Sequence, residues 1–135
     1  MPAAAQGRGA RSAKAFVRYY IATINYAATT GDLRRLRSLG SHNCGSCMAI
    51  AHNIGRIYEA GGHIEGRGWR LHTVRMLQIT GQDATLSLGV TLEPEIVVKS
   101  TGAQAEHHQG ARQPMTAFLT RTRGQWLLSR LDLVT

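Results

Sequence analysis

The hydrophobic pattern changes its period once along the chain, near Gly68, and this change constrains the fold more than any other feature. Before Gly68, apolar residues recur at intervals of three and four, the spacing of one face of a helix. After it, segments rich in β-branched and long apolar residues show the alternation of strands. Helices followed by strands are typical of an α+β domain, in which the helices cover one face of an antiparallel sheet.

Three helices are expected in the first half of the chain. The apolar stripe of residues 13–28 stops before Gly31, which favours the turn at a helix C-terminus. A short helix over residues 33–39 follows, and a third begins near Cys44 and ends at the glycine pair 61–62. One of these two glycines is expected to adopt a positive φ angle and turn the chain.

Four or five strands are expected after the helices. The candidate segments are residues 69–79, 84–92 and 95–99, and a closing hairpin over 114–135 that turns near Arg123 and Gly124. The polar residues 100–113 are expected to form a loop or a hairpin tip. The glycine-rich residues 61–68 leave a helix instead of opening one, so we interpret them as a turn and not as a phosphate-binding loop.

Residues 13–135 are expected to form a single domain, since most domains have about 100–150 residues. Residues 1–12 are small and basic without a hydrophobic pattern, which predicts a flexible arm or tether. They lack the apolar core of a secretory signal, and no run approaches the roughly 18 apolar residues of a membrane span. Two locations follow: cytoplasmic if residue 1 is the native start, or outside the cytoplasm if a signal was removed.

Three segments carry a resemblance to a known family: "AFVRYYIATINYAATTGDLRRLRSL" over 15–39, "CGSC" over 44–47 and "IYEAGGHIEGRGW" over 57–69. The chain resembles a family of short exported actinobacterial proteins, mostly predicted lipoproteins of unknown function, with a nuclear transport factor 2-like domain. The resemblance implies a cystatin-like roll, with three N-terminal helices packed on a curved antiparallel sheet of four to five strands. It also implies export and lipid anchoring in the cell envelope, although this chain has no lipobox and no cysteine before Cys44.

Cys44 and Cys47 stand three residues apart at the expected start of the third helix. A helix start lowers the pKa of a thiol, which suits a redox pair, but a thioredoxin-type motif follows a strand and here two helices precede it. Zinc would need two further ligands, and only His42 and His52 are near in sequence. The even count, the spacing and the oxidising compartment that the resemblance implies favour an intramolecular disulfide, with reduced, inert cysteines as the remaining alternative.

Folds of this kind enclose a pocket between helices and sheet, and some relatives use an Asp or His there as general base. The candidate pocket residues of this chain are His72 on the first strand and Arg130 with Asp132 on the last. Arg130 and Asp132 share one face of a strand, where a simple ion pair is the commoner explanation. No nucleophile–base set and no paired carboxylates accompany them, so we assign no catalytic residue, cofactor or metal.

Positive charge is concentrated in the N-terminal third. Residues 1–40 carry seven basic side chains and one acidic side chain, whereas residues 41–135 carry nine and seven. Arg34, Arg35 and Arg37 alternate with inward leucines and are expected to point outward together as an anion-binding patch. The alternative is a solvated surface without a partner.

These features favour a non-enzymatic, exported, envelope-associated domain that binds a protein or small ligand. Its basic third would face an anionic membrane surface or a cell-wall polymer. Two alternatives stay open: a small pocket enzyme of the nuclear transport factor 2-like fold, and a basic nucleic-acid-binding protein.

Overall fold

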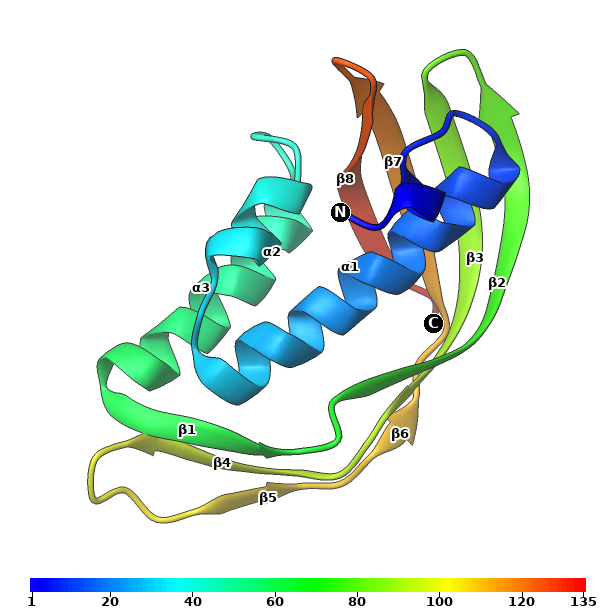
Figure 1. The fold of residues 1–135 in the computed structure, drawn as a ribbon. Helices are drawn as coiled ribbons and strands as arrows, with labels where there is room; N and C mark the ends of the chain where they lie inside the picture. The colour runs from blue at the N-terminus through cyan, green and yellow to red at the C-terminus, as the bar shows by residue number, and fades with distance from the viewer.

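The computed structural model describes residues 1–135 and has the α+β architecture predicted from the sequence (Figure 1). A short 3-10 turn, η1 (Ala3–Ala5), precedes three helices: α1 (Ala10–Thr30), α2 (Arg34–Leu39) and α3 (Gly45–Glu59). The strands are β1 (Gly61–Gly66), β2 (Trp69–Thr80), β3 (Asp83–Leu92), β4 (Glu95–Ser100), β5 (Glu106–His108), β6 (Ala111–Arg112), β7 (Met115–Thr122) and β8 (Gln125–Leu133). None of the helices combines the length and the apolar character that a membrane span requires.

The strands form two antiparallel sheets. The larger sheet has the order β2-β3-β7-β8, and β6 pairs with the far end of β3. The smaller sheet has the order β1-β4-β5. The chain passes from β3 to β4 through Pro94, so the two sheets are joined there. Figure 1 shows the three helices on one side of the curved surface that the sheets make.

Helix α1 is held at its end and along its side by backbone contacts that its sequence specifies. Gly31 follows it with a φ angle of 77°, and its N–H donates to the carbonyl of Ala27 at 2.7 Å. The side-chain amide of Asn25 forms two hydrogen bonds with the backbone of Trp69. Its Nδ2 donates to the Trp69 carbonyl and its Oδ1 accepts the Trp69 N–H, both at 2.8 Å. These two bonds fix α1 against the start of β2.

Apolar side chains fill the space between the helices and the larger sheet. Along β3, β7 and β8, buried residues alternate with exposed or half-buried ones, so each strand turns one face toward the helices. The largest side chains with less than 2% exposure are Trp126, Phe16, Leu36, Leu86, Leu88, Met115, Leu119 and Leu128. The region where the fold family's pocket was expected is therefore packed with the protein's own side chains.

Tyr20 has the one buried side-chain polar atom in this core that lacks a hydrogen-bond partner. Its side chain is buried and its hydroxyl has no hydrogen-bond partner, and this burial raises the pKa of the phenol. An unsatisfied buried hydroxyl costs about 1–3 kcal/mol. We expect Tyr20→Phe to stabilise the domain by an amount within that range, measured by urea unfolding. Tyr26→Phe, at an exposed tyrosine, should leave the unfolding midpoint unchanged; a lower stability for Tyr20→Phe would show that the hydroxyl has a partner.

The turn predicted for residues 61–68 is wrong, because residues 61–66 form strand β1. This strand pairs along its length with β4, from Gly61 opposite Ser100 to Gly66 opposite Glu95. Three glycines in six residues hide it from a propensity-based prediction. Gly61 has the positive φ angle predicted for this pair of glycines, at 83°. The predicted loop over 100–113 likewise contains the short strands β5 and β6.

The structure also differs from the flexible arm predicted for residues 1–12. Ala5 is buried in the core, and α1 begins at Ala10 instead of Ala13. The Trp126 indole N–H donates to Ser12 Oγ at 3.1 Å, and the Arg121 guanidinium donates to the carbonyl of Gly7. The segment is thus fixed by long-range contacts from β7 and β8 that its own small residues do not reveal.

Candidate functional site

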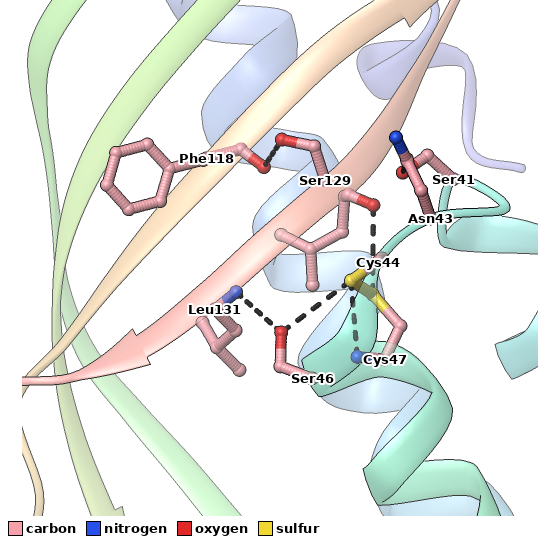
Figure 2. Close-up of a disulfide and its surroundings, with 9 residues drawn as sticks. Ser41, Asn43, Cys44, Ser46, Cys47, Phe118, Ser129 and Leu131 are labelled. Atoms are coloured by element: carbon pink, nitrogen blue, oxygen red, sulfur yellow. Dashed lines mark hydrogen bonds between the residues drawn. A yellow bond between two sulfur atoms is a disulfide. The ribbon is translucent and has the colours of Figure 1, made fainter.

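The predicted disulfide between Cys44 and Cys47 is present at the start of α3 (Figure 2), with the two Cα atoms 5.3 Å apart. Cys44 is the N-cap residue of α3, and its sulfur accepts the N–H of Cys47 at 3.2 Å. The disulfide therefore closes the first helical turn and also satisfies one of its free N–H groups.

The disulfide corner, which we define as residues 40–47, covers part of the free edge of the larger sheet. Strand β8 lies at that edge. The N–H of Ser41 donates to the carbonyl of Leu128 at 2.8 Å. Ser46 Oγ accepts the N–H of Leu131 at 2.9 Å (Figure 2). The sulfur of Cys47 lies 3.7 Å from the same Leu128 carbonyl. The corner thus occupies backbone groups that an exposed edge strand would offer to another chain.

The burial of the cysteines favours a structural role over a redox role. Cys44 has 0% exposure and Cys47 has 8%. Thiol–disulfide exchange requires an attacking thiolate to reach one of the sulfurs. Cys44 is fully buried, and Cys47 has only a small exposed area, at the groove beside the corner. We infer that the disulfide holds the corner on the sheet edge.

Reduction of this disulfide is expected to lower stability by about 2 kcal/mol, the low end of the usual range, because only four residues are enclosed. The domain should remain folded, since the core beneath the corner does not depend on the bond. Urea unfolding with and without a reductant measures the loss. The Cys44→Ser/Cys47→Ser variant should be insensitive to the reductant. Complete unfolding on reduction would contradict the prediction.

A groove of about 690 Å³ runs between α1 and α2. From α1 it is lined by Tyr19, Ala22, Thr23 and Tyr26, whose spacing places them on one helical face, and from the next segment by Asp32, Arg34, Arg35 and Ser38. Tyr26 is 54% exposed. We call this the α1–α2 groove. It brings two phenol rings beside two guanidinium groups.

Only one of the two arginines in this groove has a carboxylate partner. Arg34 donates from Nε to Asp32 Oδ1 at 3.1 Å and from Nη2 to Asp32 Oδ2 at 3.0 Å. These hydrogen bonds hold the pKa of Asp32 below its ordinary value of 3.8, so the pair remains ionised near neutral pH. Arg35 is exposed and forms no salt bridge. The groove therefore carries one uncompensated positive charge.

The prediction that Arg34, Arg35 and Arg37 form one patch needs correction. Arg37 lines a different groove of about 420 Å³, next to the disulfide corner, together with His42 and His52. The reason is that α2 turns about 100° per residue, so the residue after Leu36 emerges on its other flank. Sequence analysis missed the tyrosines of the α1–α2 groove as site residues. Their spacing of seven on α1, next to the arginines, is the signal that indicates them.

The candidate pocket residues His72, Arg130 and Asp132 are not brought together. His72 forms a 2.5 Å hydrogen bond with Thr91 Oγ1 on the face of the sheet away from the helices. Across the sheet, Asp132 of β8 is opposite Thr116 of β7, which is opposite Ser87 of β3, which is opposite Arg75 of β2. Asp132 is therefore at the level of Arg75, three residues along β2 from His72. Two strands separate β8 from β2, a width of about 14 Å.

Arg130 and Asp132 form the ion pair that was the simpler alternative. Arg130 Nε lies 3.0 Å from Asp132 Oδ2, and the guanidinium lies over the Phe118 ring, 4.0 Å from its centroid. Both contacts use exposed or half-buried side chains, so the pair contributes little to stability. It also leaves neither charged group in the interior, where the fold family's pocket was expected.

Comparison with known proteins identifies the family. Residues 1–132 match the model of a family of unknown function, DUF6318. The chain belongs to this family. No protein with a curated description matches the sequence. This match confirms the part of the sequence resemblance that concerns membership of a family of unknown function.

Solved structures share the fold of this DUF6318 chain. The intermembrane space region of the chloroplast protein ARC6 has a TM-score of 0.71 at 10% identity, covering 94% of this chain and 97% of that one. An NTF2-like protein with a cystatin-like fold from Novosphingobium aromaticivorans has a TM-score of 0.54 at 18% identity, with coverages of 89% and 79%. An uncharacterized protein with a cystatin-like fold from Caulobacter vibrioides has a TM-score of 0.53 at 13% identity, with coverages of 90% and 89%. These likenesses show the nuclear transport factor 2-like fold.

Proposed function

We propose that this DUF6318 chain is a non-enzymatic, exported domain of the cell envelope that binds an anionic, chain-like partner in the α1–α2 groove. The observation that carries the proposal is that the unpaired Arg35 and the half-exposed Tyr26 line the same groove. A charged guanidinium in a groove attracts phosphate or carboxylate groups, and an aromatic ring adds apolar contact at low entropic cost.

The shape of the groove favours a polymer over a flat membrane or a duplex. An extended anionic chain lying along the groove would meet Tyr19, Tyr26 and Arg35, because all three line it. A flat lipid surface would meet exposed arginines outside the groove equally well. An anionic cell-wall polymer is therefore the partner class that we propose.

The disulfide supports the proposed location outside the cytoplasm, because structural disulfides persist mainly in oxidising compartments. We expect protein recovered from its native cells, and alkylated without reductant, to have both thiols blocked. Mass measurement checks this. Two freely alkylated cysteines would contradict export.

Binding to three probes tests the partner class. A polyphosphate chain of defined length represents the anionic polymer, vesicles of phosphatidylglycerol the membrane, and duplex DNA the nucleic acid. At low salt we expect saturable binding of polyphosphate that weakens at moderate salt, and weaker binding of the other two. Tighter binding of vesicles or duplex, or no binding of polyphosphate at low salt, would overturn the proposal.

A further inference from the structure

A β-bulge in β2 aims His72 at a small notch on the outer face of the larger sheet. Arg70 is opposite Thr91 and Leu71 opposite Val90, but Thr73 is opposite Gly89, so His72 is the extra residue. Bulges of this kind redirect a side chain. The His72 ring lies across β3, with Nε2 2.5 Å from Thr91 Oγ1.

Gly89 creates the notch because it has no side chain and so interrupts the row of side chains on the outer face of β3. The outward residues of this strand include Thr85, Ser87 and Thr91, which alternate with buried ones. A Cβ atom at position 89 would overlap Oγ1 of Thr73. The resulting hollow of about 220 Å³ is lined by His72, Thr73, Gly89, Val90, Arg112 and Pro114.

Each polar side chain of the notch can donate a hydrogen bond, and none of its lining residues carries a carboxylate. Arg112 is opposite Thr91 across β6 and β3, is exposed, and forms no salt bridge. The nearest acid along the strand, Glu93, is taken by Arg70 at 3.2 Å. The notch therefore holds one uncompensated guanidinium.

Either neutral tautomer of His72 leaves a hydrogen-bond donor available. If the Thr91 hydroxyl donates to Nε2, the Nδ1–H of the ring is free. If Nε2–H donates to Thr91 Oγ1, the Thr91 hydroxyl hydrogen is free. The hydroxyl of Thr73 forms no hydrogen bond within the protein and adds a second donor at the floor of the notch.

We propose that this notch is a binding site for a small oxyanion, a phosphate or carboxylate group carried by a ligand, held by Arg112 with His72, Thr73 and Thr91. The guanidinium supplies a two-donor face that matches two oxygens of such a group. The site lies on the outer face of the sheet, away from the α1–α2 groove. It therefore stands independently of the proposed polymer site.

The test is an NMR titration of the isotope-labelled chain with inorganic phosphate and, separately, with acetate, at constant ionic strength. We expect saturable shifts in the amides of residues 72–73, 89–91 and 111–112. Saturation by phosphate alone identifies a phosphate site, and saturation by acetate alone identifies a carboxylate site. Saturation by both supports the shared chemistry, and no saturable shift with either anion overturns the proposal.

Three variants test whether the anion binds in the notch. Arg112→Ala removes the charged donor and should weaken binding about tenfold or more, as expected for a charged hydrogen bond. Gly89→Ala fills the notch and should abolish binding. Arg75→Ala removes an equal charge from β2, at a position opposite Ser87 that does not line the notch, and should leave affinity unchanged. Equal losses in Arg75→Ala and Arg112→Ala would overturn the site.

Folding of each variant is followed by thermal melting. Arg112 is exposed and unpaired, so Arg112→Ala should fold normally. It therefore tests the site even if Gly89→Ala disturbs the sheet. Groove variants such as Arg35→Ala should not change the phosphate or acetate titration, so failure here is distinguishable from failure of the polymer site.

Discussion

Gly62→Ala is expected to lower the free energy of unfolding by about 3 kcal/mol or more, at the upper end of overpacking costs. A Cβ atom at Gly62 would overlap the carbonyl oxygen of Val98 and would lie 2.9 Å from the backbone nitrogen of Ser100. Both atoms belong to β4, so the methyl group can be accommodated only if β1 and β4 separate. Urea unfolding measures the loss.

Gly45→Ala is the matched control for this change. Gly45 opens α3, and a Cβ atom there meets nothing within 4 Å. The control should be neutral or slightly stabilising, because alanine favours a helix. If Gly62→Ala were as stable as the control, the close pairing of β1 with β4 would be wrong.

Trp126→Ala is expected to cost about 3–5 kcal/mol, the usual range for deleting a large aromatic side chain from a core. Trp126 has 0% exposure, and its indole N–H donates to Ser12 Oγ at 3.1 Å. The substitution therefore opens a cavity beneath α1 and removes the bond that fixes the start of this helix to β8. Since domains of this size are stable by only about 5–15 kcal/mol, the variant should melt at a much lower temperature.

Trp126→Phe separates the two contributions. It keeps most of the apolar volume and loses the hydrogen bond to Ser12, so its cost should be clearly smaller than that of the alanine variant. Similar costs for both variants would show that the bond to Ser12, and not the filling of the core, is the main contribution of Trp126.

The helices and the long strands could be predicted because their own residues carry the pattern. The apolar stripe of α1 and the alternation along β3 place their buried residues correctly, and Gly31 and Gly124 are at the predicted turns. In each case the local preference and the tertiary packing agree.

Elements stabilised by partners distant in sequence could not be predicted. Strand β1 exists because β4 supplies its hydrogen bonds. Gly62 is needed for close approach to β4, whereas Gly61 supplies the positive φ angle after α3. Ala5 is buried because Trp126 and Arg121 fix the segment around it. Neither partner is visible from the local sequence.

The candidate sites show the same limit. The spacing of Cys44 and Cys47 at a helix start, their even count and the oxidising compartment implied by the family resemblance together predicted their disulfide. Arg34, Arg35 and Arg37 are close in sequence, yet α2 divides them between two grooves. His72 was predicted as a pocket residue, but the bulge in β2 and the register of β3 place it in the outer notch. Side-chain chemistry can be predicted from sequence, whereas the face on which it lies depends on the complete sheet.

Comparing Arg35→Ala with Arg37→Ala tests the proposed function most directly. Both remove one exposed charge from α2, but only Arg35 lines the α1–α2 groove. We expect Arg35→Ala to weaken polyphosphate binding about fivefold, corresponding to about 1 kcal/mol for one charge at an anionic surface, while Arg37→Ala binds like the unmodified chain. Equal losses in the two variants would mean that polyphosphate responds only to net charge, and would contradict a binding site in the groove.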